Sequence, residues 1–154
     1  MASTLELKFP PLPLALVVAV IMWVLAQAGR GGWEVLPGQR TIAIVVSLLG
    51  AVIVVLGIVA FRRFRTTVNP MKPEAVSTLV TCGIYRLTRN PMYVGFLLVL
   101  SGWALFLSNA LAVSGVPAYF LYMNRFQIEP EERVLAATFG LAYSAYKSRV
   151  RRWL

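Results

Sequence analysis

The chain divides into long apolar stretches and short polar segments. Residues 9–29 and residues 41–61 contain no charged side chain. Each stretch is long enough to cross a hydrocarbon core of about 30 Å at a rise of about 1.5 Å per residue. Both stretches are therefore predicted to be membrane-spanning helices.

A third uncharged stretch covers residues 90–124. As one helix it would be about 52 Å long, well beyond the thickness of the hydrocarbon core. Ser108 and Asn109 lie near its middle and favour a turn. We therefore expect a helical hairpin over residues 92–124, and one long helix bent at the middle is the alternative.

A helical period follows the hairpin. Apolar or aromatic side chains recur there at spacings of three or four residues, as Leu135, Phe139, Tyr143, Tyr146 and Val150. This stripe predicts one helix over residues 129–150, lying at the membrane surface. The predicted fold class is an all-α integral membrane protein, a single domain over residues 1–154. It has about four transmembrane helices, of which the last two form the hairpin, and a cytoplasmic C-terminal interfacial helix.

Composition supports the membrane class. Hydrophobic residues make up 58% of the chain and the mean hydropathy is +0.72, which exceeds what an ordinary soluble domain shows. The region before residue 29 also resembles a signal peptide, because Ala26-Gln27-Ala28 has the small residues of a cleavage site. Its apolar run is longer than a usual signal core, so we expect a retained helix.

The net charge is +9, and the basic residues that produce it are distributed unevenly between the two predicted sides of the membrane. Most Lys and Arg residues lie in residues 62–91 or after residue 124, whereas the loop between the first two spans holds only Arg30 and Arg40. Cytoplasmic loops carry such an excess, so the 62–91 segment and both termini are predicted to be cytoplasmic. Attraction to anionic membrane lipids explains the basic excess without a nucleic-acid partner.

The residue types that are missing narrow the chemistry. The chain contains no histidine and no aspartate, and Cys82 is its only cysteine. His-based catalytic triads, the usual zinc sites and an intramolecular disulfide are therefore excluded, and no metal is expected. Catalysis by this chain would have to use Glu, Arg, Tyr, Asn and backbone groups.

Two polar motifs flank the predicted hairpin, around Arg89 on one side and around Glu131 and Glu132 on the other. A hairpin returns the chain to the same membrane face, so these charges can converge on one small ligand, and ionisable groups at a membrane boundary often mark a site. Structural roles are also open. The glutamates suit the first turn of a helix, and Arg89 suits an interfacial anchor.

The motifs resemble those of a known family. The first block reads Arg89-Asn90-Pro91-Met92-Tyr93-Val94-Gly95 and is similar to the Arg-His-Pro-x-Tyr-x-Gly block of the isoprenylcysteine carboxyl methyltransferases. That family in turn resembles the phospholipid N-methyltransferases. The second block contains Glu131, Glu132, Leu135, Phe139, Gly140, Tyr143, Tyr146 and Val150. The resemblance covers about residues 66–154. Asn90 departs from it by replacing histidine, and Arg151 by replacing proline.

The resemblance implies an S-adenosylmethionine-dependent methyltransferase with its cofactor at the cytoplasmic interface. It implies catalytic roles for Arg89 and Glu132. The cofactor-binding residues that it implies are Tyr85, Arg89, Asn90, Pro91, Tyr93, Gly95, Glu131, Glu132, Tyr143 and Tyr146. Arg89 would pair with a carboxylate, the tyrosines would present ring faces to adenine, and either glutamate would accept from the ammonium or ribose.

The acceptor implied by the resemblance is a lipophilic or prenylated molecule, such as an isoprenylcysteine-like carboxylate. A phospholipid amine or a small thiol is the alternative acceptor. A non-enzymatic membrane scaffold is the alternative function. The sequence leaves open which glutamate contacts the cofactor, what Asn90 does in place of histidine, and the oligomeric state.

Overall fold

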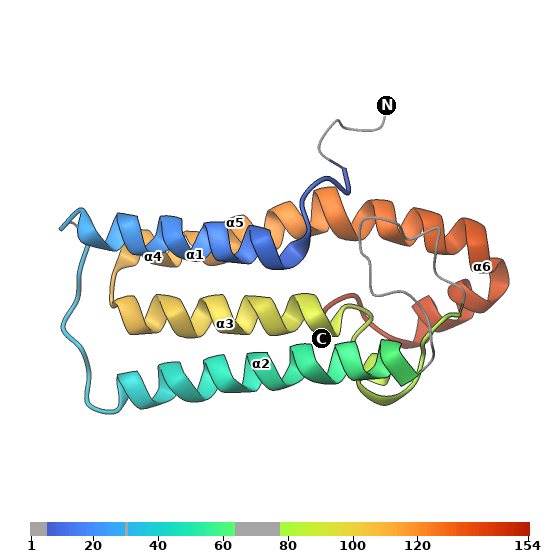
Figure 1. Ribbon diagram of the computed structural model, residues 1–154, viewed down its shortest axis with the longest axis horizontal. Coiled ribbons are helices and arrows are strands. Elements are labelled where there is room, and N and C mark those ends of the chain that lie inside the picture. The colour runs from blue at the N-terminus through green and yellow to red at the C-terminus, as the bar shows by residue number, and fades with distance from the viewer. Residues whose placement is uncertain (1–5, 30, 64–77) are drawn as a thin grey trace.

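A computed structural model describes residues 6–29, 31–63 and 78–154 of the chain, and the predicted segment 66–91 lies partly outside these ranges. Helices dominate the described residues, whose only β pairing is an isolated bridge between Gly32 and Asn109, and this confirms the all-α prediction for them. The elements are α1 (Pro11–Gln27), α2 (Gln39–Arg63), the 3₁₀ turn η2 (Gly83–Arg86), α3 (Pro91–Leu107), α4 (Ala110–Val113), α5 (Gly115–Tyr122), the π-helical turn η3 (Met123–Ile128) and α6 (Glu129–Arg149). Figure 1 shows α1, α2, α3 and α5 side by side along one long axis.

Membrane character rests mainly on α2. This helix has 25 residues and a hydropathy of 3.1 over its most apolar window, which is long and apolar enough to cross a bilayer. The apolar helices α1 and α3 have 17 residues each and are shorter than that. Large apolar side chains of α1 and α2 are about half exposed, such as Leu16 at 60% and Leu48 at 61%. The count of four spans stays a prediction.

Helices α2 and α3 pack almost backbone to backbone. A Cβ atom at Gly50 would lie 2.5 Å from the carbonyl oxygen of Gly95, and one at Gly95 would lie 2.6 Å from that of Gly50. Gly102 repeats the pattern, since a Cβ atom there would lie 2.5 Å from the carbonyl oxygen of Ala43. Small residues permit this approach, which is typical of helix packing in membranes. It fixes the position of α3, whose first turn carries the motif around Arg89.

The chain reverses between α3 and α4 at Ser108 and Asn109. Ser108 adopts the left-handed conformation with φ of 49°, and the Asn109 side chain accepts hydrogen bonds from the second and third backbone N–H groups of α4. Gln39 fastens the start of α2 to this turn, because its Nε2 donates to the Leu105 carbonyl (2.7 Å) and to Ser108 Oγ (2.8 Å). The result is an antiparallel pair formed by α3 and the α4–α5 arm (Figure 1).

Helix α5 continues into α6 through η3, so residues 125–128, between the predicted hairpin and the predicted C-terminal helix, are helical as well. Pro130 explains the local distortion. Its ring lacks an N–H and displaces the carbonyl four residues earlier, at Phe126. That carbonyl instead accepts from the backbone N–H of Leu7 at 3.0 Å. The N-terminal segment is thereby attached to the same end of the bundle as α6.

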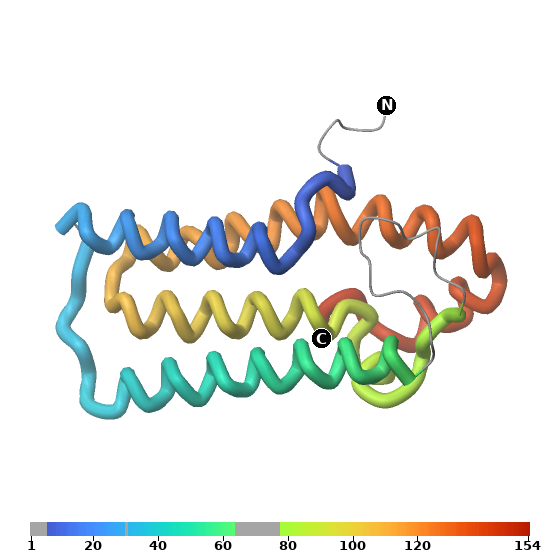
Figure 2. Tube along the Cα trace, viewed as in Figure 1, coloured from blue at the N-terminus to red at the C-terminus, as the bar shows by residue number. Residues whose placement is uncertain are grey.

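The prediction of one uninterrupted helix over residues 129–150 is wrong at Gly140. This residue has φ of 50° and ψ of −121°, a conformation that interrupts α6. Glycine adopts such angles without the steric cost of a side chain. The chain turns back at this point, as the tube in Figure 2 shows, and brings Tyr143 and Tyr146 into buried positions. Leu135 and Phe139, before the turn, are only half-buried.

We expect Gly50→Ala to destabilise the protein by about 1–3 kcal/mol, because the added methyl group forces α2 and α3 apart. Alanine is the better helix former, so propensity alone predicts the opposite sign. The apparent melting temperature in detergent measures the effect. Val52→Ile, which adds a methyl group at a position 54% exposed on the same helix, is the matched control. Equal melting temperatures for both variants would contradict the close contact.

Candidate functional site

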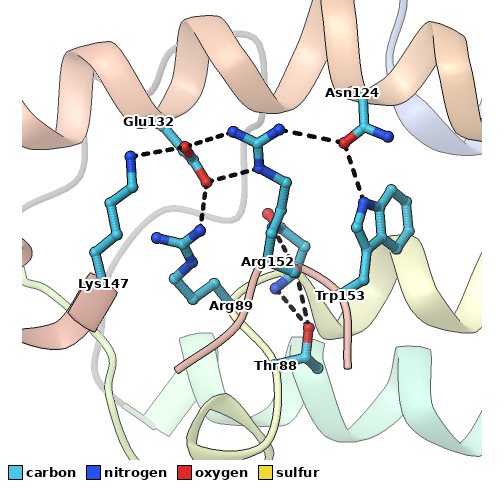
Figure 3. Close-up of polar contacts among 8 residues, drawn as sticks. Thr88, Arg89, Asn124, Glu132, Lys147, Arg152 and Trp153 are labelled. Carbon is cyan, nitrogen blue, oxygen red and sulfur yellow. Dashed lines mark hydrogen bonds and ion pairs between the residues drawn. The ribbon is translucent and has the colours of Figure 1, made fainter. Parts of the chain in front are cut away.

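Three segments meet at one end of the bundle: residues 88–90 before α3, helix α6, and residues 150–154, which we call the C-terminal segment (Figure 3). Pro91 opens α3, where its ring fixes a helical φ and its missing N–H costs nothing. The backbone N–H of Arg89 donates to the Arg151 carbonyl at 3.0 Å. A backbone hydrogen bond therefore holds Arg89 to the C-terminal segment two residues before α3 begins.

Glu132 is the centre of an ion cluster. Arg89 Nη2 lies 2.9 Å from Glu132 Oε1, and Lys147 Nζ lies 3.3 Å from Oε2. Arg152 binds both oxygens, with Nε 3.1 Å from Oε1 and Nη2 2.9 Å from Oε2. The side chains of Glu132 and Arg89 are only 9% and 8% exposed. Figure 3 shows the three cations converging on the one carboxylate.

These cations determine the charge state of Glu132. Burial by itself would raise the pKa of this carboxyl, but the hydrogen bond from Arg152 and the charges of Arg89, Arg152 and Lys147 lower the pKa below its ordinary value. The same contact raises the pKa of Arg152, through its hydrogen bond to Glu132. Glu132 is therefore ionised at neutral pH and is occupied on both oxygens.

Arg89 keeps two donors free of this cluster. Its Nε and Nη1 atoms are buried and have no hydrogen-bond partner among the residues that the structure describes. A buried donor left unpaired costs about 1–3 kcal/mol, and more when the group is charged. A planar guanidinium with unused donors is suited to a carboxylate or phosphate. The arrangement at Arg89 therefore fits an anionic ligand.

Glu131 lies beside this cluster with a different partner. The Tyr93 hydroxyl is 2.9 Å from Glu131 Oε2 and 3.2 Å from Oε1. Desolvation raises the pKa of Glu131 to about 8, the charge of Glu132 adds to the rise, and the hydrogen bond with Tyr93 opposes it. The two neighbouring glutamates thus differ in charge near neutral pH, because among the described residues cations contact Glu132 and none contacts Glu131.

The tyrosines after Gly140 return towards α2 and η2. The Tyr146 hydroxyl donates to the Tyr85 carbonyl at 2.7 Å, and the Tyr85 ring packs edge-on against Phe61 at 5.4 Å between ring centres. Tyr143 and Tyr146 lie 6.4 Å apart between ring centres. Burial raises the pKa of Tyr85 and of Tyr146, and it raises that of Tyr143 to about 12. All three hydroxyls are neutral at physiological pH.

Asn90 contacts the C-terminal segment. Its Nδ2 donates to the Arg152 carbonyl at 2.9 Å, and the Thr88 hydroxyl donates to the same carbonyl at 3.1 Å. Gly95 lies at the contact with α2, and Pro91 is fully buried at the start of α3. The structure thus brings Arg89 to Glu132, Tyr93 to Glu131, and Tyr85 to Tyr146. The cofactor-binding roles of these residues stay predictions.

The sequence did not single out the residues that complete the cluster, which are Asn124, Lys147, Arg152 and Trp153. Asn124 Oδ1 accepts from Trp153 Nε1 at 3.0 Å and lies 3.5 Å from Arg152 Nη1. By sequence, Lys147 and Arg152 are only two of the basic residues on the predicted cytoplasmic side. The sequence offers one sign that these residues have a role. Lys147 and Arg152 lie well beyond the last predicted span, and an aromatic residue follows Arg152 directly. The same pattern also fits an interfacial anchor.

Comparisons with known proteins agree with the resemblance in the motifs. The family model for phospholipid methyltransferases matches residues 39–142. A "Probable protein-S-isoprenylcysteine O-methyltransferase" of Oryza sativa subsp. indica is 34% identical over 116 residues, covering 73% of this chain and 59% of its own. The Xenopus laevis protein-S-isoprenylcysteine O-methyltransferase is 34% identical over 115 residues, covering 68% of this chain and 38% of its own.

An uncharacterized protein of Haemophilus influenzae is 49% identical over 63 residues, which cover 41% of this chain and 100% of that protein. The matched part of the chain covers less than two thirds of the length of the Oryza and Xenopus relatives. No solved structure matches the chain at a significant level.

The raised pKa of Glu131 makes stability depend on pH in a definite direction. Between its ordinary value of 4.5 and about 8, the unfolded chain loses this proton while the folded chain keeps it. The contribution of Glu131 to stability is thus complete at low pH and is lost as the pH rises through about 8. We expect Glu131→Gln, which cannot ionise, to gain stability over the wild type as the pH rises from 5 to 8.

Apparent melting temperatures in detergent between pH 5 and pH 9 measure this difference. Glu129→Gln, on the same helix as Glu131, is the matched control, because the exposed ion pair of Glu129 with Arg125 of η3 contributes little. Parallel pH curves for Glu131→Gln and the wild type would show that Glu131 titrates normally.

Proposed function

Because the chain belongs to the phospholipid methyltransferase family, we propose that it is an S-adenosylmethionine-dependent methyltransferase that acts on a lipophilic acceptor at one face of a membrane. The observation that carries the proposal is the pair of buried Arg89 donors, Nε and Nη1, which have no partner within the described ranges. They lie in the ion cluster around Glu132, and Glu131 lies beside that cluster.

The residues fit the amino-acid end of S-adenosylmethionine. The unused donors of Arg89 would hold its carboxylate. Glu131 would accept hydrogen bonds from its ammonium group, and a cation at that position would lower the pKa of Glu131 and ionise it. Glu132 already has cations on both oxygens, so we assign it the role of holding Arg89. The rings of Tyr143 and Tyr146 lie 6.4 Å apart between centres, and the Tyr146 hydroxyl contacts the Tyr85 backbone, so we assign these three tyrosines to the border of the adenine.

When bound, the cofactor supplies an electrophilic methyl group on a sulfonium. The protein has to align an acceptor with it and keep water away. A carboxylate acceptor is already ionised and needs no base from the chain. An amine or thiol acceptor must lose a proton, and Glu131, once the ammonium group has ionised it, is the nearby carboxylate that would take this proton.

An apolar recess supports a lipophilic acceptor. It has a volume of about 450 Å³ and lies between α1, α2 and α3. Its walls are almost wholly apolar and include Leu12, Leu16, Val54, Phe96 and Trp103. Phe96 follows Tyr93 by three residues on α3, so the recess begins about one helical turn from the residue that contacts Glu131. We propose that the hydrocarbon part of the acceptor enters here from the bilayer.

The site end of the bundle is proposed to face the cytoplasm. The segment that holds Leu7, the end of α2 with Arg62 and Arg63, η2 and α6 all lie at this end (Figure 1). In the proposed multi-pass arrangement both termini and residues 62–91 are cytoplasmic, where a charged cofactor is accessible. The basic side chains then lie where anionic lipids attract them.

We expect Arg89→Gln and Glu131→Gln each to weaken binding of S-adenosylhomocysteine about 10- to 100-fold, the range for losing a hydrogen bond to a charged group. Isothermal titration calorimetry on detergent-purified protein measures the affinity. Arg133→Gln removes an exposed charge from α6, the helix that carries Glu131, and serves as the control. A folded wild type that binds neither this compound nor S-adenosylmethionine would favour the scaffold alternative.

The acceptor class can be read from transfer of a labelled methyl group to a prenylcysteine, a phosphatidylethanolamine or a small thiol. We expect the prenylcysteine carboxylate to be methylated. Glu131→Gln at saturating cofactor should then lower kcat less than tenfold, because this reaction needs no base. Transfer only to the amine or thiol, with kcat lost in Glu131→Gln, would assign the site to the alternative acceptors.

A further inference from the structure

The C-terminal segment makes contacts that the proposed function does not use. Val150 leaves α6 with an extended backbone, at φ of −123° and ψ of 131°. The Arg151 carbonyl then accepts from the Arg89 backbone, and the Arg152 carbonyl accepts from the side chains of Thr88 and Asn90. The segment is thus paired with residues 88–90, immediately before α3.

The side chain of Arg152 is fixed on two sides. On one side it binds both oxygens of Glu132, at 3.1 Å and 2.9 Å. On the other side Asn124 Oδ1 lies 3.5 Å from Nη1 and also accepts from Trp153, whose ring packs on Phe120 at 4.8 Å between ring centres. The fork geometry of this guanidinium is therefore set by groups from α5, η3 and α6.

The two-point contact of Arg152 with Glu132, which we call the fork, limits how Arg89 can bind the same carboxylate. Arg89 reaches Glu132 through Nη2 alone, at 2.9 Å from Oε1. With both carboxylate oxygens open, a planar guanidinium favours a bidentate pair, and Arg89 would then use Nε for Glu132 as well. Arg152 occupies the position that such a pair needs with two contacts, and Lys147 adds one longer contact to Oε2. It thereby leaves Nε and Nη1 of Arg89 without a partner in the described part of the chain.

We propose that Arg152 is a positioning residue: its fork on Glu132 keeps two donors of Arg89 available for a carboxylate group of the ligand. The inference rests on the proposed function and adds a residue to it. Arg152 acts through Glu132 and Arg89 and does not itself contact the ligand. The partner chemistry is that of an amino-acid carboxylate, which S-adenosylhomocysteine shares with the proposed cofactor.

A double-mutant cycle on S-adenosylhomocysteine binding tests the inference, with Arg152→Gln, Glu132→Gln and the double variant measured by titration calorimetry. We expect Arg152→Gln to weaken binding at least tenfold. In the Glu132→Gln background, where no carboxylate competes for Arg89, the same change should alter affinity less than threefold. Residues in one ion network show such non-additivity, whereas an effect of Arg152 that does not pass through Glu132 would add. Arg149→Gln, an exposed charge at the end of α6, is the control.

Unchanged binding by Arg152→Gln, or additive losses in the cycle, would overturn the inference while leaving the proposed function intact. If the wild type itself binds neither S-adenosylhomocysteine nor S-adenosylmethionine, the proposed function fails and the inference with it. Arg152→Lys covers the case in which Arg152→Gln does not fold, because lysine keeps the charge but cannot fork. We expect several-fold weaker binding from it at a melting temperature near that of the wild type, and wild-type affinity would also overturn the inference.

Discussion

The ionised carboxylate of Glu132 is the constraint on which the site end of the molecule depends. A buried charge is stable only when its partners replace the water that it has lost. Here those partners come from three separate segments: Arg89 before α3, Lys147 after the turn in α6, and Arg152 in the C-terminal segment. Satisfying one carboxylate therefore fixes how α3, both halves of α6 and the C-terminal segment meet.

The same cluster sets the electrostatic character of the site. Three cations face one carboxylate, so the cluster has an excess of positive charge. Glu131, one residue away, lacks direct cationic partners within the described ranges and keeps its proton to a higher pH. The two adjacent carboxyl groups thereby differ in ionisation state, and the difference comes from their environments alone. A ligand with both a carboxylate and an ammonium group complements this arrangement, which is why the family assignment and the geometry support one proposal.

The apolar part of the fold supplies the rigidity that the cluster needs. Close contact between Gly50 and Gly95 fixes α3 against α2, and Pro91 starts α3 directly after Arg89. On the other side of the site, Pro130 leaves the Phe126 carbonyl without its helical partner, and Leu7 takes that position. Each of these contacts lies at a helix terminus or a helix crossing, so backbone geometry sets where the start of α3 and the start of α6 lie in the site.

The sequence by itself determined the helical class, the positions of the apolar helices and the reversal near Ser108, because apolar length and turn-forming residues are local properties. It also singled out Arg89, Glu131 and Glu132 through their motifs. Only the tertiary structure decided that Glu132 holds the cations, that Gly140 turns α6 back, and that Arg152 completes the cluster. A periodic pattern can be continued through a glycine, and an ion pair joins residues as far apart as 89 and 132. The turn and the ion pair both depend on which parts of the backbone approach one another in space. The local sequence around each residue does not specify that approach.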